Sequence, residues 1–150
     1  MIILEPVITP EPPLPRYLSI VFLVSCLIAP PAFAEALHFQ SPSGNIRCVI
    51  ADGDGAFVRC DLGVDEQTYT ARPAACDGQW GTSFGLTMTG DGFLNCVTVP
   101  IDPDATPIVL PYGTGLEAAG ITCQSEVTGI TCTNNEGGGF AVRRAEQRVF

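Results

Sequence analysis

Short hydrophobic runs alternate with turn-forming residues over most of the chain. From residue 35 onward, clusters of glycine, proline and aspartate separate these runs, and none of the runs carries a long apolar stripe with helical spacing. We therefore predict an all-β fold, a small antiparallel sandwich or barrel stapled by disulfides. The predicted strands cover residues 37–41, 45–50, 56–62, 83–89, 93–99, 108–110, 120–124, 129–133 and 140–142. Residues 143–150 form either a further strand or one helical turn.

The first 34 residues differ from the rest of the chain in hydropathy. Residues 17–29 form an uncharged apolar run behind an arginine, two prolines end the run, and Ala32 and Ala34 occupy the small positions that a signal peptidase recognises. A membrane-spanning helix needs about 20 apolar residues, so this run is too short to be one. We predict an N-terminal extension and secretion signal over residues 1–34 and a single disulfide-stapled β domain over residues 35–150, without a transmembrane span.

A second route of export is open at Cys26. Residues 23–26 read LVSC, which is similar to the lipobox of bacterial lipoproteins, and Cys26 would then carry the lipid. The apolar run continues beyond Cys26 and the small-residue site lies downstream, so the sequence favours cleavage after Ala34. Both routes place the protein in the periplasm or the extracellular space, with a lipid anchor if Cys26 is acylated.

The cysteines after the predicted signal are even in number, as expected for disulfides in an oxidising compartment. They are Cys48, Cys60, Cys76, Cys96, Cys123 and Cys132. In the chain-entropy model each of three bridges stabilises the fold by about 3 kcal/mol. The net stability of such a domain is about 5–15 kcal/mol, so the bridges together are comparable with the whole margin.

Two predicted hairpins set the pairing of these cysteines. In the hairpins centred on residues 52–56 and 127–128, two cysteines lie at equal distances from the centre and therefore face each other. Directly opposed residues on paired strands are close enough for a disulfide. The remaining two cysteines then pair around the middle hairpin. The predicted bridges are Cys48–Cys60, Cys123–Cys132 and Cys76–Cys96.

The charge of the chain narrows the range of partners. Seven arginines, no lysine and 16 acidic residues give a formal net charge of −9. Nucleic acid is excluded as a partner because phosphate binding needs a basic surface. The acidic residues are dispersed over the turns, where they favour solubility; in a functional role they would attract a cationic partner such as a basic envelope protein. Arg143, Arg144 and Arg148 form the one basic cluster, which we expect to pair with the domain's own acids; it could instead contact an acidic partner or lipid head groups.

Two sequence patterns resemble serine-hydrolase chemistry, and neither is complete. Residues 81–85 read GTSFG and match G-x-S-x-G around Ser83, but that motif needs an α/β fold and a downstream histidine. The single histidine, His38, lies upstream. It could act as a base for Ser41 or Ser43, but no third group to orient it is evident. We therefore predict no catalytic residues.

Metal and cofactor sites are also poorly supported. Asp52 and Asp54 lie in a D-G-D-G stretch, yet an EF-hand loop counted from Asp52 would need glycine and glutamate where the chain has Phe57 and Gly63. The stretch fits a tight hairpin turn instead. With one histidine and no C-x-x-C motif, zinc and thioredoxin-like redox roles are not predicted. We predict no cofactor.

The aromatic residues are expected to fill the small core rather than to line a groove for a glycan or peptide. They are Phe39, Phe57, Tyr69, Trp80, Phe84, Phe93, Tyr112 and Phe140. Tyr112 is the exception, because a Pro-Tyr-Gly turn favours an exposed ring as much as a buried one. The candidate surface-binding residues are therefore Tyr112 and two arginines of the basic cluster, Arg143 and Arg144.

Several motifs together resemble a known family. Residues 39–48 read FQSPSGNIRC, which is similar to the opening F-x-S-P-S-G-N-I-x-C of a family of uncharacterised small bacterial exported domains. Further matching positions are Cys60, Cys76 with Trp80, 110–113 (LPYG), 123–125 (CQS), 129–134 (GITCTN) and 139–140 (GF). The resemblance implies an exported, disulfide-stapled β domain and carries no activity. The chain departs from it at Arg143, where the closing pattern G-F-x-x-S-R often has serine.

Three hypotheses of function follow from these observations. The first is a non-enzymatic interaction module of the bacterial cell envelope or extracellular space, whose partner is an unknown protein or envelope component. The second is an acidic inhibitor of a cationic envelope hydrolase of the lysozyme or protease class. The third is a small serine hydrolase that uses Ser83, Ser41 or Ser43.

Overall fold

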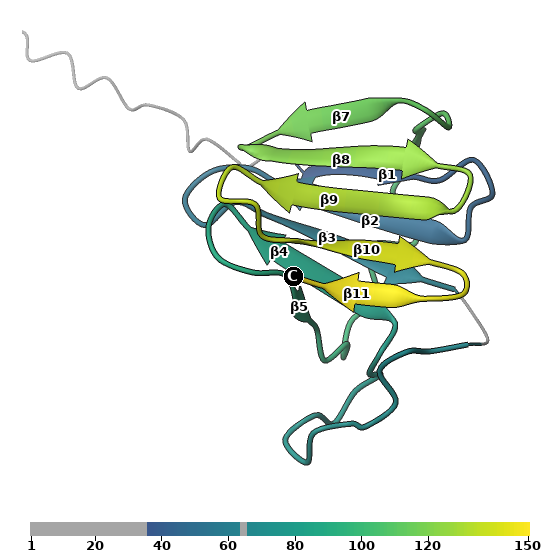
Figure 1. Cartoon of the computed structure of the whole chain (residues 1–150), viewed down its shortest axis with the longest axis vertical. Helices are drawn as coiled ribbons and strands as arrows, with labels where there is room; N and C mark the ends of the chain where they lie inside the picture. Colours follow the sequence, from purple (N-terminus) through teal and green to yellow (C-terminus); the bar gives the residue numbers. More distant parts are fainter. Residues whose placement is uncertain (1–35, 64–65) are drawn as a thin grey trace, which may run out of the picture. The chain divides into compact units, whose positions relative to one another are not determined.

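The structure, a computed structural model, describes residues 36–63 and 66–150, and these residues belong to one compact unit. They form eleven strands and no helix, arranged in two sheets of six and five strands that pack around one hydrophobic core (Figure 1). The predicted all-β class is confirmed, and of the two architectures left open the fold is the sandwich. Within the described part of the chain, no helix has the length and hydrophobicity needed to cross a membrane.

The two sheets differ in strand order. The six-stranded sheet has the order β5-β4-β3-β2-β1-β6, and the five-stranded sheet has the order β11-β10-β9-β8-β7. Neighbouring strands are antiparallel except β1 and β6, which run parallel. The strands are β1 (Ala36–Gln40), β2 (Ile46–Ala51), β3 (Phe57–Leu62), β4 (Ser83–Thr87), β5 (Phe93–Leu94), β6 (Ile108–Val109), β7 (Gly115–Ala118), β8 (Ile121–Glu126), β9 (Gly129–Asn134), β10 (Gly139–Arg143) and β11 (Gln147–Val149).

The predicted signal over residues 1–34, its cleavage site after Ala34 and the candidate lipidation site Cys26 lie outside the described residues. Export by either route therefore stays a prediction. The division of the chain at residue 34 also stays a prediction.

The structure departs most clearly from the predicted strands at two places, and it settles one choice that the sequence left open. The strand predicted over 93–99 ends at Leu94, and beyond it a single bridge joins Gln79 to Val97. β7 was not predicted, because glycine, glutamate and alanine are depleted from strands; it forms as an edge strand on β8. Residues 147–149 resolve the open C-terminal choice in favour of a strand, β11, paired with β10.

The core is built from the inward-facing residues of both sheets. Alternate residues of β2, β3, β8 and β9 are buried, as expected for strands with one face on the core. Phe39, Phe84 and Phe140 are fully buried, which confirms their predicted place. The same prediction was wrong for Phe57 and Phe93, whose side chains are 37% and 42% exposed. Phe57 alternates with buried Val58 and so faces outward, and the ring of Phe93 lies over Gly85 on the outer face of the sheet.

Tyr112 and Trp80 also lie outside the core. Tyr112 is 42% exposed, whereas Trp80 is half-buried and does not belong to the core cluster. Tyr69 is partly buried and packs against the core from the connection between β3 and β4, with its ring 6.1 Å from that of Phe84. The long loops therefore hold one aromatic residue against the sandwich and leave others at the surface.

The predicted disulfide pairing is confirmed, and two of the bridges lie inside the core. Cys48–Cys60 joins directly opposed residues of β2 and β3, with Cα atoms 4.1 Å apart, and Cys123–Cys132 joins opposed residues of β8 and β9, with Cα atoms 4.0 Å apart. All four cysteines are fully or almost fully buried. Each sheet therefore contains one cross-strand bridge on its inner face.

A buried asparagine joins the two sheets at one end of the sandwich. Asn134, the last residue of β9, donates from Nδ2 to the carbonyl oxygens of Thr87 (3.1 Å) and Gly90 (2.7 Å). Its Oδ1 accepts from the backbone N–H groups of Glu136 and Gly138, both at 3.0 Å. The turn after β4 and the turn after β9 touch through their backbones here, since a Cβ atom on Gly138 would collide with the Gly90 carbonyl. All four hydrogen-bonding positions of the amide are thus used.

Replacing Asn134 with alanine should lower the free energy of unfolding by about 3 kcal/mol, because two backbone carbonyls and two backbone N–H groups lose the buried amide that bonds them. Urea denaturation of the oxidised protein measures this change. The neighbouring exposed residue supplies a matched control: Asn135→Ala should stay within about 0.5 kcal/mol of the wild type. Equal stabilities for the two variants would show that the Asn134 amide does not hold the sheets together.

Candidate functional site

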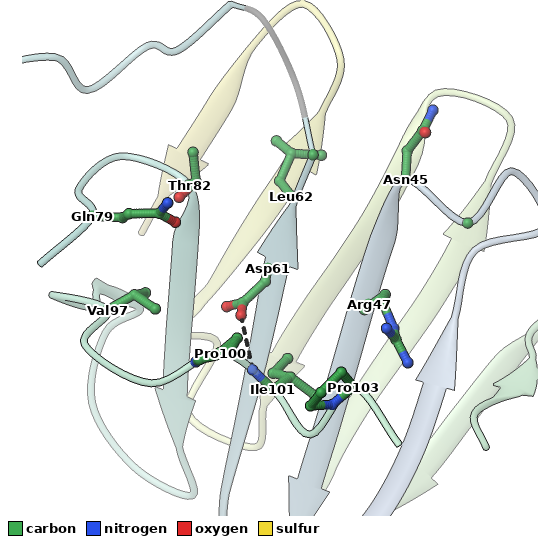
Figure 2. Close-up of a pocket in the computed structure, with 12 residues that line it drawn as sticks. Asn45, Arg47, Asp61, Leu62, Gln79, Thr82, Val97, Pro100, Ile101 and Pro103 are labelled. Carbon is green, nitrogen blue, oxygen red and sulfur yellow. Dashed lines mark hydrogen bonds between the residues drawn. The ribbon is translucent and has the colours of Figure 1, made fainter. Parts of the chain in front are cut away.

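A cleft of about 390 Å³ opens beside the ends of β2 and β3, on the outer side of the six-stranded sheet (Figure 2). We call it the outer cleft. Its volume falls within the range of small-molecule sites, roughly 300–1,000 Å³. Its polar lining residues are Asn45, Arg47, Asp61, Gln79 and Thr82, and its apolar lining residues are Leu62, Val97, Pro100, Ile101 and Pro103, with Gly44 and Gly63 at the strand ends.

The alternation of β2 and β3 places two charged side chains at this cleft. Arg47 and Asp61 are directly opposed in the β2–β3 ladder. Each is next in sequence to a buried cysteine, Cys48 or Cys60, so both charged side chains project from the outer face of the sheet. The same strand register therefore places the disulfide in the core and the side chains of Arg47 and Asp61 on the outer face.

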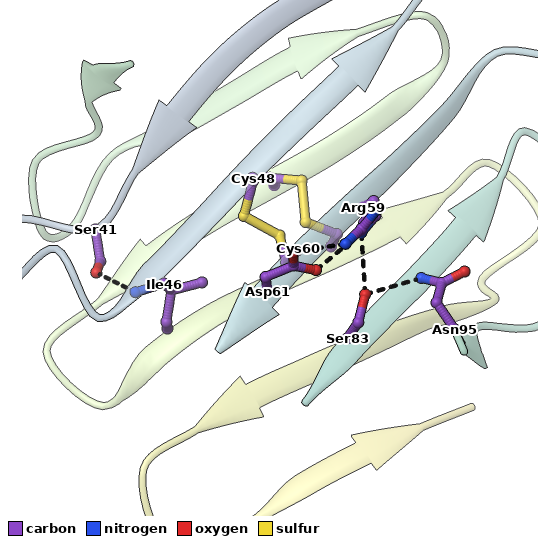
Figure 3. The surroundings of a disulfide bond; sticks show 10 residues. Ser41, Ile46, Cys48, Arg59, Cys60, Asp61, Ser83 and Asn95 are labelled. Atoms are coloured by element: carbon purple, nitrogen blue, oxygen red, sulfur yellow. Dashed lines mark hydrogen bonds and ion pairs between the residues drawn. A yellow bond between two sulfur atoms is a disulfide. The ribbon is translucent and has the colours of Figure 1, made fainter. Parts of the chain in front are cut away.

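The charge of Asp61 is neutralised from within the sheet. Arg59, two residues earlier on β3, donates from Nε to Asp61 Oδ1 at 2.9 Å and from Nη2 to Asp61 Oδ2 at 2.7 Å (Figure 3). The Arg59 Nε also donates to the Oγ of Ser83 at 3.1 Å, and Asn95 Nδ2 donates to the same oxygen at 3.3 Å. The Ile101 N–H reaches Asp61 Oδ2 at 3.5 Å (Figure 2). Asp61 thus binds the backbone of Ile101 at the rim of the cleft. Its negative charge is compensated by the bidentate contact with Arg59.

Arg47 has no such partner among the described residues. Its Nη2 donates to the carbonyl oxygen of Ala105 at 3.4 Å, and no described carboxylate lies within 4.0 Å of its guanidinium group. In Figure 2 its side chain lies beside Pro103, on the side of the cleft opposite Gln79. Arg47 and Asp61 are the two charged residues that line the cleft. Because Asp61 is paired with Arg59, Arg47 is the one whose charge is matched by no carboxylate among the described residues.

The third disulfide braces one wall of the outer cleft. Cys76–Cys96 lies next to the bridge at which Gln79 and Val97 exchange two backbone hydrogen bonds, each of 2.9 Å. Gly78 lies so close to the Val97 carbonyl that a Cβ atom would collide with it. Unlike the four core cysteines, Cys96 is exposed. This bridge therefore orders a surface wall and contributes nothing to the core cluster.

The predicted surface residues lie at a different place, a groove of about 120 Å³ at one end of the sandwich. Tyr112 and Arg144 both line this end groove, together with Ser41, Ser43 and Glu126. The predicted Arg143 does not line it; its guanidinium lies 4.0 Å from the Glu126 carboxylate, and both side chains are about half exposed. Two of the three predicted residues are thus brought together, and their role in binding stays a prediction.

The candidate catalytic and metal-binding residues are dispersed. His38 lies on β1 opposite Val49 and does not line the groove that contains Ser41 and Ser43. Ser83 lies in β4, where its hydroxyl accepts hydrogen bonds from a guanidinium and an amide. Asp52 lies in the turn between β2 and β3, as predicted. The described residues contain no group of three or more His, Cys, Asp or Glu side chains that could hold a metal ion.

The outer cleft was not predicted from the sequence. Arg47 and Asp61 could have been found from their alternation with Cys48 and Cys60, which predicts outward side chains on neighbouring strands. The rim could not have been found, because residues 93–99 were predicted as one strand and no element was predicted over 100–103.

Limited reduction should open Cys76–Cys96 before the other bridges, because Cys96 is exposed and the four core cysteines are inaccessible. We expect a mild thiol reductant on the folded protein, followed by alkylation and peptide mass spectrometry, to label Cys76 and Cys96 first. Far-UV circular dichroism on the same sample should still report the sandwich. Simultaneous labelling of all six cysteines would contradict this order.

Comparison with known proteins gives one match. A family described as "Family of unknown function (DUF6636)" matches residues 18–150. No curated protein and no solved structure matches the chain. The match covers most of the sequence and agrees with the resemblance to an uncharacterised family. The chain belongs to the DUF6636 family, whose function is unknown.

Proposed function

We propose that this chain is an exported, non-enzymatic binding domain that holds its ligand in the outer cleft. The observation that carries the proposal is the Arg47 guanidinium, which lies at a cleft of about 390 Å³ with a single backbone carbonyl as its partner among the described residues. A few polar groups on otherwise apolar walls are typical of small-ligand sites. Gln79 and Thr82 add an amide and a hydroxyl to this set.

The serine-hydrolase hypothesis has less support than the binding hypothesis. The donors on the Ser83 hydroxyl, Arg59 Nε and Asn95 Nδ2, cannot accept its proton. Ser41 is buried, and its Oγ lies 3.1 Å from Ser43 Oγ and accepts from the Ile46 N–H at 3.2 Å. These contacts stabilise the turn before β2 and supply no base for either serine.

Three disulfides support export, since such bridges form and persist in oxidising compartments. A small domain has only a small hydrophobic core. Disulfides would therefore add the stability that a binding domain needs in the bacterial periplasm or outside the cell. The partner is then a molecule of the envelope or the surrounding medium.

A cleft-filling variant tests the proposal. A Cβ atom at Gly63 meets only the Asn45 carbonyl oxygen, at an ordinary 3.7 Å, so Gly63→Phe can add a ring to the cleft lining without backbone strain. We expect a screen of small polar fragments, followed by the amide shifts of the ¹⁵N-labelled protein, to map binding to Arg47, Gln79 and Val97. The same shifts should be lost in Gly63→Phe.

Val127→Phe is the matched control, because Val127 lies at the exposed tip of the β8–β9 hairpin, 80% exposed. It should bind the fragments as the wild type does. Fragment shifts that survive in Gly63→Phe, or that never involve the cleft, would contradict the proposal.

A further inference from the structure

We propose that the outer cleft binds the carboxylate end of a short peptide, with the Arg47 guanidinium as the anchor for the carboxylate. This inference rests on the proposed function, which it extends by naming a class of ligand. It is drawn from the charge of the cleft, from its walls and from its size.

Asp61 is the one acidic residue among those that line the cleft. Its carboxylate already accepts both prongs of Arg59 and the Ile101 N–H, so it neither needs a cation from a ligand nor leaves an uncompensated negative charge. Arg47 has four N–H donors besides the one given to Ala105, and a planar carboxylate can accept two of them side by side. A chain with a net charge of −9 repels anions in general, so a guanidinium group without a carboxylate partner among the described residues marks where an anionic group can bind.

The walls of the cleft fit the rest of a peptide. The Gln79 amide can both donate and accept a hydrogen bond, as a peptide group does, and Thr82 adds a hydroxyl. In Figure 2 the Gln79 side chain extends toward Thr82 across the cleft from Arg47. Val97, Pro100 and Ile101 offer apolar surface for short side chains. The volume of about 390 Å³ is larger than a lone carboxylate fills.

The end groove fits such a ligand less well. Its volume is about 120 Å³, and Arg144 shares it with the carboxylate of Glu126. An anion there would meet both charges. The outer cleft is therefore the better place for a terminal carboxylate.

Isothermal titration and ¹⁵N amide shifts with N-acetyl-Ala-Ala test the inference on the wild-type protein. The free acid should bind at least tenfold more tightly than the C-terminal amide of the same dipeptide, because a charge-assisted contact is lost in the amide. Acetate should bind at least tenfold more weakly than the dipeptide acid, since it leaves the apolar walls and the amide side chains without partners. The affinity for the acid should fall as salt is raised.

Variants locate the anchor. Arg47→Gln should lose at least tenfold in affinity for the acid and little for the amide, and Arg47→Lys should recover part of the loss, because lysine keeps the charge without the fork. Arg148→Gln removes one positive charge from β11 of the other sheet, where the guanidinium lies 4.7 Å from the Phe150 ring, and should bind within twofold of the wild type. Near-UV circular dichroism of each variant checks the fold.

The outcomes separate this inference from the proposed function. Equal binding of acid and amide in the cleft would overturn the carboxylate anchor and leave a cleft that binds other ligands. Acetate binding as tight as the dipeptide acid would overturn the peptide assignment. If neither dipeptide nor any fragment shifts the cleft amides, both the inference and the proposed function fail.

Discussion

The register of β2 against β3 is the constraint on which most of the molecule depends. The Cys48–Cys60 bridge joins opposed residues of these strands and lies in the core, so a slip of one position would break the bridge and turn every side chain of a strand to the other face. With that register set, the residues between the buried ones must face outward. Arg47, Arg59 and Asp61 are on the outer face for this reason, and the outer cleft follows from the same pairing that makes the core.

The disulfides divide into two kinds by what they hold. Cys123–Cys132 repeats in the five-stranded sheet what Cys48–Cys60 does in the other, and the two bridges replace apolar volume that a small domain lacks. Cys76–Cys96 lies apart from the core cluster and limits the freedom of the loops before β4 and after β5. Loops without strand pairing lose much conformational entropy when they become ordered. A disulfide lowers this entropic cost because it already restricts the loops in the unfolded chain. A preformed wall at the outer cleft is the result.

The sequence predicts the core of this fold better than the outer cleft, for physical reasons. Turn-forming clusters and hairpin symmetry give the strands and place Cys48 opposite Cys60, because these features act between neighbouring segments. β7 was not predicted because its residues have low intrinsic strand propensity. They form a strand because they pair with the neighbouring strand β8. Phe57 was assigned to the core because hydrophobicity was weighed without its alternation with Val58. The cleft rim around Ile101 depends on a contact between a loop and the distant residue Asp61 of β3, which no sequence periodicity indicates.

The motifs that carry the family resemblance are mostly those that build the fold. Cys48 forms a core bridge, Asn134 joins the sheets, and Phe140 fills the space between them. Arg47, in contrast, occupies the unspecified position of the N-I-x-C pattern, next to a residue that cannot change without loss of the bridge. A position that always faces outward, beside a rigid register, can change its side chain without disturbing the core. In this chain that position carries the guanidinium group at the outer cleft, while the surrounding motif keeps the strand ends that line the cleft in place.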